Sequence, residues 1–446
     1  MPTFSQLNSA DVVRALANGT LSQLYRSAAL PGAGVTDVQG DALGQYFEKG
    51  QTISILRPKD LGSAQDYDPR SGSDATTVEA GYVNVSLSLE KLFTSGFPVY
   101  SHDQNVERYI RDYAVSTGGA VRKSLDDYFY DKAFRDWSGI AASGAVNVDA
   151  HPPLAIVASD GGSGGLSTFD KDLLINAGKI LDSRDVPNTN RVARLGVTAK
   201  AGFLGDSQMV EGFAGAQASM NPGSNLIASG FGLNIDVERY GFLCRGSNAI
   251  TGQAALADTG DGNASEVVGA VADDSTVFFE GDQYASTPLG AVRLTITQTA
   301  NLAAGVAVGK IARIGADAGA AVAFGVILRV DAANKYVWLV PYSPDGTKLT
   351  AANITAATDK FSVPAIGEIS TASHREQFVY ATRQLRPPTP GSGALAESAI
   401  DANSGLLLQI FKGTYNVHQF KEGIRTACLC GAIPTDWRKG VLMITA

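Results

Sequence analysis

Two runs of alternating apolar and polar residues, joined by a long polar stretch, restrict what this chain can fold into. Residues 52–57 and 82–89 alternate in the manner of strands that bury one face. The residues between them, 58–80, include almost no apolar side chains. Hairpin loops usually have about two to five residues. We therefore predict a hairpin whose loop extends from the subunit to reach another molecule.

The charged residues of this hairpin are our candidates for contact with a neighbouring subunit. The run from Asp66 to Asp74 lacks the Asp-x-Asp-x-Asp-Gly spacing of a calcium loop, so we expect it to be solvated or to meet a basic partner. Exposed ion pairs contribute only about 0–1 kcal/mol each, so they stabilise an assembly only in large numbers. The candidates are Arg57, Lys59, Asp60, Asp66, Asp68, Arg70, Asp74 and Glu79.

Residues 101–137 are predicted to form one long amphipathic helix. Ser101 and Gln104 form a capping box at its start. Apolar residues recur at helical spacing on one face, and charged residues cover the opposite face. At roughly 1.5 Å per residue the helix would be about 55 Å long, with a bend predicted at Gly118 and Gly119. Few compact domains need a helix of this length.

The rest of the chain has the pattern of a mixed α/β body with a β-rich insertion. A helix is predicted over 169–181, and Pro187 is expected to prevent it from continuing. Between about 250 and 370, short alternating runs rich in Ala, Gly, Val and Thr, with frequent turn signals, predict a small β-barrel. Strands of the body are predicted at 154–158, 191–197, 230–237, 406–411 and 441–444.

These patterns predict an α+β fold made of five units. The body is formed by two separate stretches, because the β-rich unit is inserted between them. The units are an N-terminal arm (1–50), an extended β-hairpin loop (51–95), a spine helix with a peripheral region (96–150), a central α/β body (151–250 and 371–446) and the inserted β-rich domain (251–370).

The composition indicates self-association and argues against a protein that coats nucleic acid. Charged residues make up 18% of the chain, against about 25% in typical proteins, and 49 of the 446 residues are glycine. This is little charge for the surface of a monomer, whereas the cores of interfaces are depleted in charge. The formal net charge is −8, and phosphate binding depends on Lys and Arg.

We expect neither a metal site nor a cofactor. The three cysteines are too few for a disulfide framework and indicate a reducing compartment. Cys428 and Cys430 have no second ligand pair that would complete a zinc site, so we expect both to be small buried apolar side chains, while Cys244 stands alone. The histidines form no metal-binding pair; they are His102, His151, His374 and His418.

Two glycine-rich stretches formally approach catalytic or phosphate-binding motifs. Residues 161–165 match the Gly-x-Ser-x-Gly nucleophile elbow at Ser163, but no helix is predicted to start at that serine. A flexible loop is the simpler interpretation. Residues 305–311 fall one residue short of a phosphate loop and lack its hydroxyl, so contact between strands is favoured. We therefore expect no enzymatic activity.

The chain has no signal for export or membrane insertion. The first residues have neither the basic start nor the apolar core of a signal peptide. No stretch approaches the roughly 18 apolar residues of a membrane span. We expect a soluble protein that is made in the cytoplasm and has no membrane partner.

In this order of elements the chain resembles the major capsid (coat) protein of tailed double-stranded DNA bacteriophages. A helix leads to a Val-Pro…Arg passage at Val186, Pro187 and Arg191, which is similar to one in the body of that family. Residues 229–235 look like the Gly-Phe strand that precedes an inserted domain, and 405–445 resemble the closing strands. The β-rich unit looks like that of the subgroup with an extra domain.

The resemblance implies a structural protein without enzymatic activity. In that family the hairpin loop lies over an adjacent subunit, the long helix forms a spine and the mixed body lies at capsomer centres. Copies of such a protein form the hexamers and pentamers of an icosahedral shell, which encloses DNA without sequence-specific binding. The implied location is the virion, after assembly in the host cytoplasm. The implied partners are many copies of itself, a scaffolding protein and a portal protein, with a decoration protein as a further candidate.

Three alternatives remain open at this point. The first is a shell subunit of a bacterial nanocompartment with the same fold, which would hold cargo protein in place of DNA. The second, from a different class, is a serine hydrolase using Ser163. The third is a phage tail or decoration protein, for which the long helix has no obvious use. The insertion and the N-terminal arm favour the viral shell.

Overall fold

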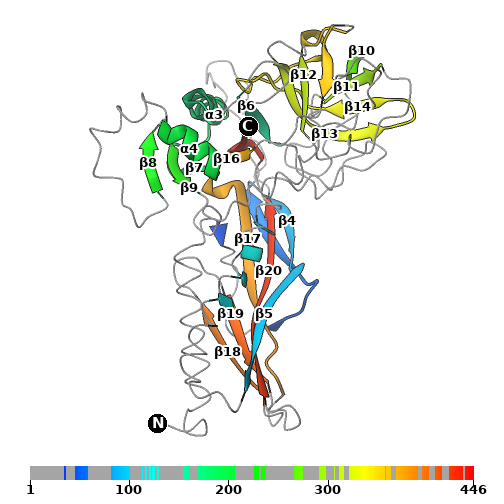
Figure 1. Cartoon of the computed structure of the whole chain (residues 1–446). Helices are drawn as coiled ribbons and strands as arrows, with labels where there is room; N and C mark the ends of the chain where they lie inside the picture. The colour runs from blue at the N-terminus through cyan, green and yellow to red at the C-terminus, as the bar shows by residue number, and fades with distance from the viewer. Residues whose placement is uncertain are drawn as a thin grey trace, which may run out of the picture.

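The computed structural model describes an α+β fold in which strands predominate, as the sequence patterns predict. Figure 1 shows a long stalk of strands that carries a sheet with helices and, beside it, a barrel. The described residues are 35–36, 46–58, 82–100, ten positions between 113 and 129, 154–159, 169–205, 226–230, 233–237, 266–274, 291–297, 306, 311–315, 321–356, 358–362, 368–389, 394–400, 407–413, 421–434 and 437–445.

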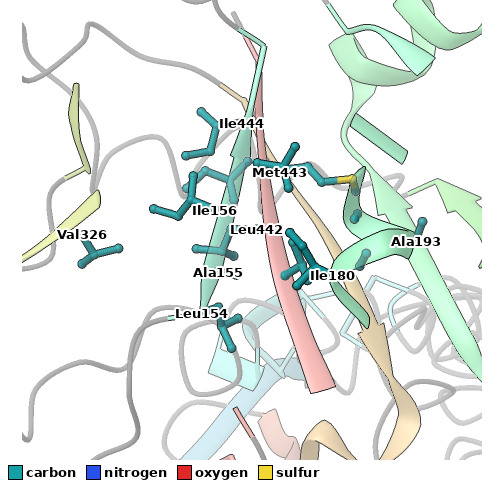
Figure 2. Packing of buried hydrophobic residues seen from close by; sticks show 14 of the residues in the cluster. Leu154, Ala155, Ile156, Ile180, Ala193, Val326, Leu442, Met443 and Ile444 are labelled. Atoms are coloured by element: carbon teal, nitrogen blue, oxygen red, sulfur yellow. The ribbon is translucent and has the colours of Figure 1, made fainter. Parts of the chain in front are cut away.

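The head sheet is a six-stranded mixed sheet at the top of the stalk. Its strand order is β6 (Ala155–Ala158), β21 (Gly440–Thr445), β16 (Glu368–His374), β7 (Arg191–Leu195), β9 (Leu233–Val237) and β8 (Leu226–Gly230). Every residue of β6, β21 and β16 is buried. Strands this fully buried need cover on both faces, and α3 (Lys171–Ser183) supplies part of it through a buried apolar stripe. Figure 2 shows the packed side chains of β6 and β21 with Ile180 of α3.

The loop between α3 and β7 is held by a buried arginine. The Arg191 guanidinium donates to the carbonyl of Pro187 (2.8 Å) and to that of Val186, and it pairs with the Asp182 carboxylate (2.7 Å). This arrangement is the structural role of the Val-Pro…Arg passage. The helix itself ends at Ser183, two residues beyond the predicted end at 181 and before Pro187, because Asp185 takes a left-handed backbone conformation (φ 54°).

The structure corrects two predicted strand boundaries in the head. The strand predicted over 191–197 ends at Leu195, and a helix, α4 (Val197–Gly205), begins two residues later. The Glu368 carboxylate on β16 accepts from the backbone N–H groups of Thr198 (3.1 Å) and Ala199 (2.5 Å), so it caps α4 from across the sheet. The strand predicted over 230–237 is a hairpin of β8 and β9, in which Gly230 pairs with Leu233.

The stalk sheet has seven strands arranged around the long strand β20 (Lys421–Pro434). Strand β5 (Lys91–Tyr100) follows one edge of β20, while β19 (Leu407–Lys412) and β17 (Phe378–Leu385) share the other edge. The remaining strands are β18 (Leu395–Ile400) beside β19, and β1 (Val35–Thr36) and β2 (Tyr46–Phe47) beside β17.

A glutamine side chain completes the sheet where β17 and β19 diverge. Gln409 is buried on β19, and its amide Oε1 accepts from Leu385 N–H (2.9 Å) while its Nε2 donates to Leu385 O (3.0 Å). The Thr382 hydroxyl accepts from Leu407 N–H (2.8 Å) in the same gap. Side chains therefore replace the backbone pairing that the shared edge of β20 prevents.

The predicted spine helix covers one face of the stalk sheet. All ten described positions between 113 and 129 are helical, while the predicted ends and bend lie outside the described residues. Leu125 and Phe129 are buried in the same cluster as Tyr380, and the Phe129 and Tyr380 rings lie 5.0 Å apart. This packing gives the apolar face of the predicted amphipathic helix its partner.

The inserted unit contains a closed six-stranded barrel, as its alternating runs predict. Its strand order is β10 (Glu266–Asp274), β11 (Ala291–Ile296), β14 (Tyr336–Leu339), β13 (Ala321–Asp331), β12 (Ile311–Gly315) and β15 (Lys360–Ser362). Alternate residues of these strands form a separate apolar core inside the barrel. The borders that we predict for this domain and for the other four units stay predictions.

The segment after β14 holds the barrel against the head. Pro344 O accepts from Ala158 N–H on β6 (3.2 Å), and Lys179 on α3 pairs with Asp345 (3.5 Å). A side chain at Gly346 (φ 83°) would place its Cβ 2.2 Å from Ile180 Cδ1, so the turn requires glycine. Figure 2 shows Val326 of the barrel among the residues of the head core.

We expect the Gln409→Met substitution to lower the free energy of unfolding by about 2 kcal/mol, because it leaves the Leu385 amide and carbonyl without these partners in a largely buried sheet. Denaturant unfolding checks this. Gln384→Met, on a half-buried residue of β17, is the matched control and should change the same quantity by less than about 0.5 kcal/mol. Equal effects of the two substitutions would contradict the role of Gln409.

Candidate assembly surfaces

The predicted hairpin is present as a two-stranded sheet of its own. Strands β3 (Thr52–Pro58) and β4 (Tyr82–Ser88) pair antiparallel, from Thr52 opposite Ser88 to Pro58 opposite Tyr82. Seven residues per strand correspond to a ribbon of about 23 Å. A two-stranded hairpin is marginally stable by itself in water.

The base of this hairpin is anchored on the stalk sheet. Ile53, Leu87 and Leu89 are buried in a small apolar cluster with residues of β17 and β20. Backbone hydrogen bonds from Gly50 N–H to Leu89 O and from Leu89 N–H to Gln51 O, both 2.9 Å, close the ribbon at this end. The hairpin therefore leaves the subunit from a fixed base.

A glycine in β20 permits the close approach of β4. A Cβ on Gly431 would lie 2.2 Å from the backbone oxygen of Ser88 and 2.7 Å from Leu87 Cδ2. No side chain fits without displacing the hairpin from the stalk sheet. By contrast, a Cβ on Gly423, in the same strand, would meet nothing within 4 Å.

The opposite face of β20 carries the two neighbouring cysteines under the spine helix. Cys428 and Cys430 are both buried in the large apolar cluster, which confirms that they are small core side chains. Burial raises the pKa of the Cys430 thiol well above its usual value, and contact with Cys428 raises it further. Cys244 lies outside the described residues.

The structure describes only the base of the predicted contact surface. Arg57 is placed in β3, where its backbone pairs with that of Val83. The other seven candidates, Lys59, Asp60, Asp66, Asp68, Arg70, Asp74 and Glu79, lie outside the described residues. The contacts of all eight side chains stay predictions.

The chemical candidates from the sequence are only partly described. Ser163, His102, His151 and His418 lie outside the described residues. In the part of the chain that the structure describes, no three His, Cys, Asp or Glu side chains are grouped so that they could hold a metal ion. Within that part, no helix is long and apolar enough to cross a membrane. Val306, in the stretch that resembles a phosphate loop, is buried in the barrel core.

The described histidine, His374, lies at the junction between the head and stalk sheets. It is the last residue of β16 and is buried. Its Nδ1 accepts from Glu376 N–H (3.2 Å), which caps the short 3-10 helix η6 (Arg375–Gln377). Burial lowers the pKa of His374, so the ring is neutral at pH 7. The sequence alone identified His374 only as one of the histidines that form no metal-binding pair.

We expect Gly431→Ala to separate the hairpin base from the stalk sheet and to lower the free energy of unfolding by about 1–3 kcal/mol, because the added methyl group collides with backbone. Gly423→Ala is the matched control in the same strand and should leave stability within about 0.5 kcal/mol. Limited proteolysis of β3 and β4 provides a second readout. An unchanged cleavage rate in Gly431→Ala would contradict the anchoring role.

Comparisons with known proteins give matches among solved structures. No family model matches the sequence, and no curated protein matches it. The capsid of cyanophage P-SCSP1u is 10% identical, with 93% of this chain and 86% of that chain covered and a TM-score of 0.40. A structure of Gordonia phage Cozz is 10% identical, with coverages of 94% and 87% and a TM-score of 0.39. The capsid of Ralstonia phage GP4 is 8% identical, with coverages of 94% and 91% and a TM-score of 0.36. The solved structures to which this chain is similar thus include phage capsids.

Proposed function

We propose that this chain is the major capsid protein of a tailed-phage type of shell. Its copies form hexamers and pentamers of an icosahedral virion that encloses double-stranded DNA. The observation that carries the proposal is the β3–β4 hairpin, which is fixed at its base and paired with no further strand among the described residues. Since such a ribbon gains stability from a partner surface, a neighbouring copy is the simplest source.

The composition supports a subunit that covers much of its surface with copies of itself. Only 18% of its residues are charged, and the net charge is −8. Low charge suits interface cores, while a net acidic chain does not bind tightly to a packaged genome. Many weak contacts per subunit stabilise a closed shell and still allow wrongly placed subunits to dissociate.

The fold supports the same function through its stiffness. The stalk combines the long strand β20 with neighbours on both edges and a helix on one face. The head and the stalk share core residues, so the hairpin and the barrel are carried by one connected framework. A shell subunit needs such a framework because its contacts must meet those of its neighbours at fixed angles.

We further propose the partners and location that such a shell requires. These are a scaffolding protein during assembly, a portal protein at one vertex and a decoration protein as a candidate on the outer surface. Assembly takes place in the host cytoplasm, and the product is the virion. The barrel lies beside the head and is available as a further contact surface in the shell.

Electron microscopy of the chain expressed alone and fractionated by sedimentation tests the proposal. We expect closed shells, tubes or spirals, because the contacts between copies are built into the subunit. Monomers or small rings that a candidate scaffolding protein does not change would contradict it. The contents of particles from the natural source then distinguish a viral shell from a bacterial nanocompartment. Nuclease-protected DNA indicates a virion, and protein cargo indicates a nanocompartment.

Deleting residues 60–78 is expected to leave a folded subunit that fails to form stable shells, because the loop loses both its reach and the charged side chains that would contact a neighbour. Circular dichroism checks the fold and sedimentation checks assembly. A control variant replaces the same residues with Gly and Ser at equal length. It should also fail, since it restores the reach and not the charges. Normal shells from the deletion variant would contradict the role of the loop.

A further inference from the structure

One antiparallel ribbon, in which β16 and β17 run beside β21 and β20, connects the head sheet to the stalk sheet. Its pairing is interrupted once, between the two sheets. In the head, β16 pairs with β21 from Glu368 opposite Thr445 to Ser373 opposite Gly440. In the stalk, β17 pairs with β20 from Phe378 opposite Pro434 onward. Between these pairings each strand of the ribbon contains a short 3-10 turn, η6 in one and η7 (Trp437–Lys439) in the other.

An ion pair joins the two turns across the ribbon. Lys439 Nζ, in η7, lies 2.6 Å from Glu376 Oε2, in η6. The backbone of η6 is also tied to the head, because Arg375 N–H donates to Asn190 O (3.1 Å). The angle between the two sheets therefore depends on how these two turns sit against each other.

The buried ring of His374 supports η6 only in its neutral form. Its Nδ1 accepts from Glu376 N–H (3.2 Å), and a proton on Nδ1 would remove this acceptor and place two donors face to face. The same Nδ1 lies 4.0 Å from Glu376 Oε2. An imidazolium would therefore compete with Lys439 for the Glu376 carboxylate.

We propose that this junction is a proton-operated hinge, in which protonation of His374 breaks the cap of η6, draws Glu376 away from Lys439 and changes the angle between the head and stalk sheets. The charged groups that face His374 come from three elements. Glu376 in η6 favours the proton, while Lys439 in η7 and Arg191 in β7 oppose it. A hydrogen bond with the Thr189 backbone also favours it, and burial is the largest opposing influence.

The sign of the pH effect follows from these contacts. The pKa of His374 is lowered from its ordinary value of 6.5, so the folded chain holds this ring neutral through pH 7. The unfolded chain takes up the proton first as the pH falls. Stability is therefore complete above the unfolded pKa of about 6.5 and declines as the pH falls toward the lower pKa of the folded chain, at which the hinge responds.

Electron paramagnetic distance measurement on unassembled subunits tests the proposal independently of shell formation. Spin labels go on Ile175→Cys in α3 and Leu395→Cys in β18, two exposed positions on the head and the stalk. Cys244 is replaced by Ser, while the buried Cys428 and Cys430 remain. On acidification from pH 7.5 we expect the distance distribution to shift at the pH where the folded chain protonates His374, below 6.5, with circular dichroism unchanged.

Two variants separate the hinge from a general acid effect. His374→Asn keeps an acceptor near the position of Nδ1 and cannot take up a proton, so its distance distribution should not depend on pH. Lys439→Gln removes the ion pair and should shift the distribution toward the acid form at pH 7.5. The matched control is Lys179→Gln, which breaks the surface ion pair between α3 and Asp345, away from the junction of the head and stalk sheets, and should shift nothing.

Histidine NMR titration of the same variants supplies a second readout. Lys439→Gln should raise the pKa of His374, because a nearby positive charge is lost, and Glu376→Gln should lower it. A wild-type distance distribution that stays constant through the pH at which the NMR titration shows His374 to be protonated would overturn the proposal. A pH response that persists unchanged in His374→Asn would overturn it as well.

Discussion

The antiparallel pairing of β16–β17 with β20–β21 is the constraint on which the rest of this structure depends. One ribbon is central to the head sheet and to the stalk sheet, so each sheet is built outward from it. The hairpin base packs on its stalk part and α3 on its head part. The chain between β17 and β20 forms β18 and β19, which extend the stalk sheet, whereas the inserted barrel precedes β16.

Polar side chains make this ribbon specific instead of weakening it. Strand β16 is buried although it reads Glu-Ile-Ser-Thr-Ala-Ser-His. Glu368 caps α4, Ser370 accepts from Gly196 N–H (3.2 Å), and His374 caps η6. These hydrogen bonds form only in the observed register, so a shift of register would leave the buried groups without these partners. The same logic applies to Gln409 in the stalk.

Sequence patterns predicted the parts of the fold that follow local rules. The strands 52–58 and 82–88 and the helix 171–183 lie close to their predicted positions, and the barrel strands lie within the predicted stretch from about 250 to 370. The sequence patterns fail to predict elements that depend on residues distant in the sequence. Strand β16 has no apolar alternation, β5 contains Gly96 and Pro98, and the start of α4 depends on Glu368. For the candidate surface, the sequence placed the hairpin, while its anchoring at Gly431 required the structure.

By itself the sequence determined the class of fold, the hairpin with its long charged loop, the spine helix and the insertion, because periodicity and composition are local properties of a chain. Only the tertiary structure decided that Arg191 closes the α3–β7 loop, that Gln409 stands in for a strand and that His374 lies between two sheets. These roles depend on backbone groups brought together by folding. A residue that is ordinary in the sequence becomes decisive where burial leaves it a single partner.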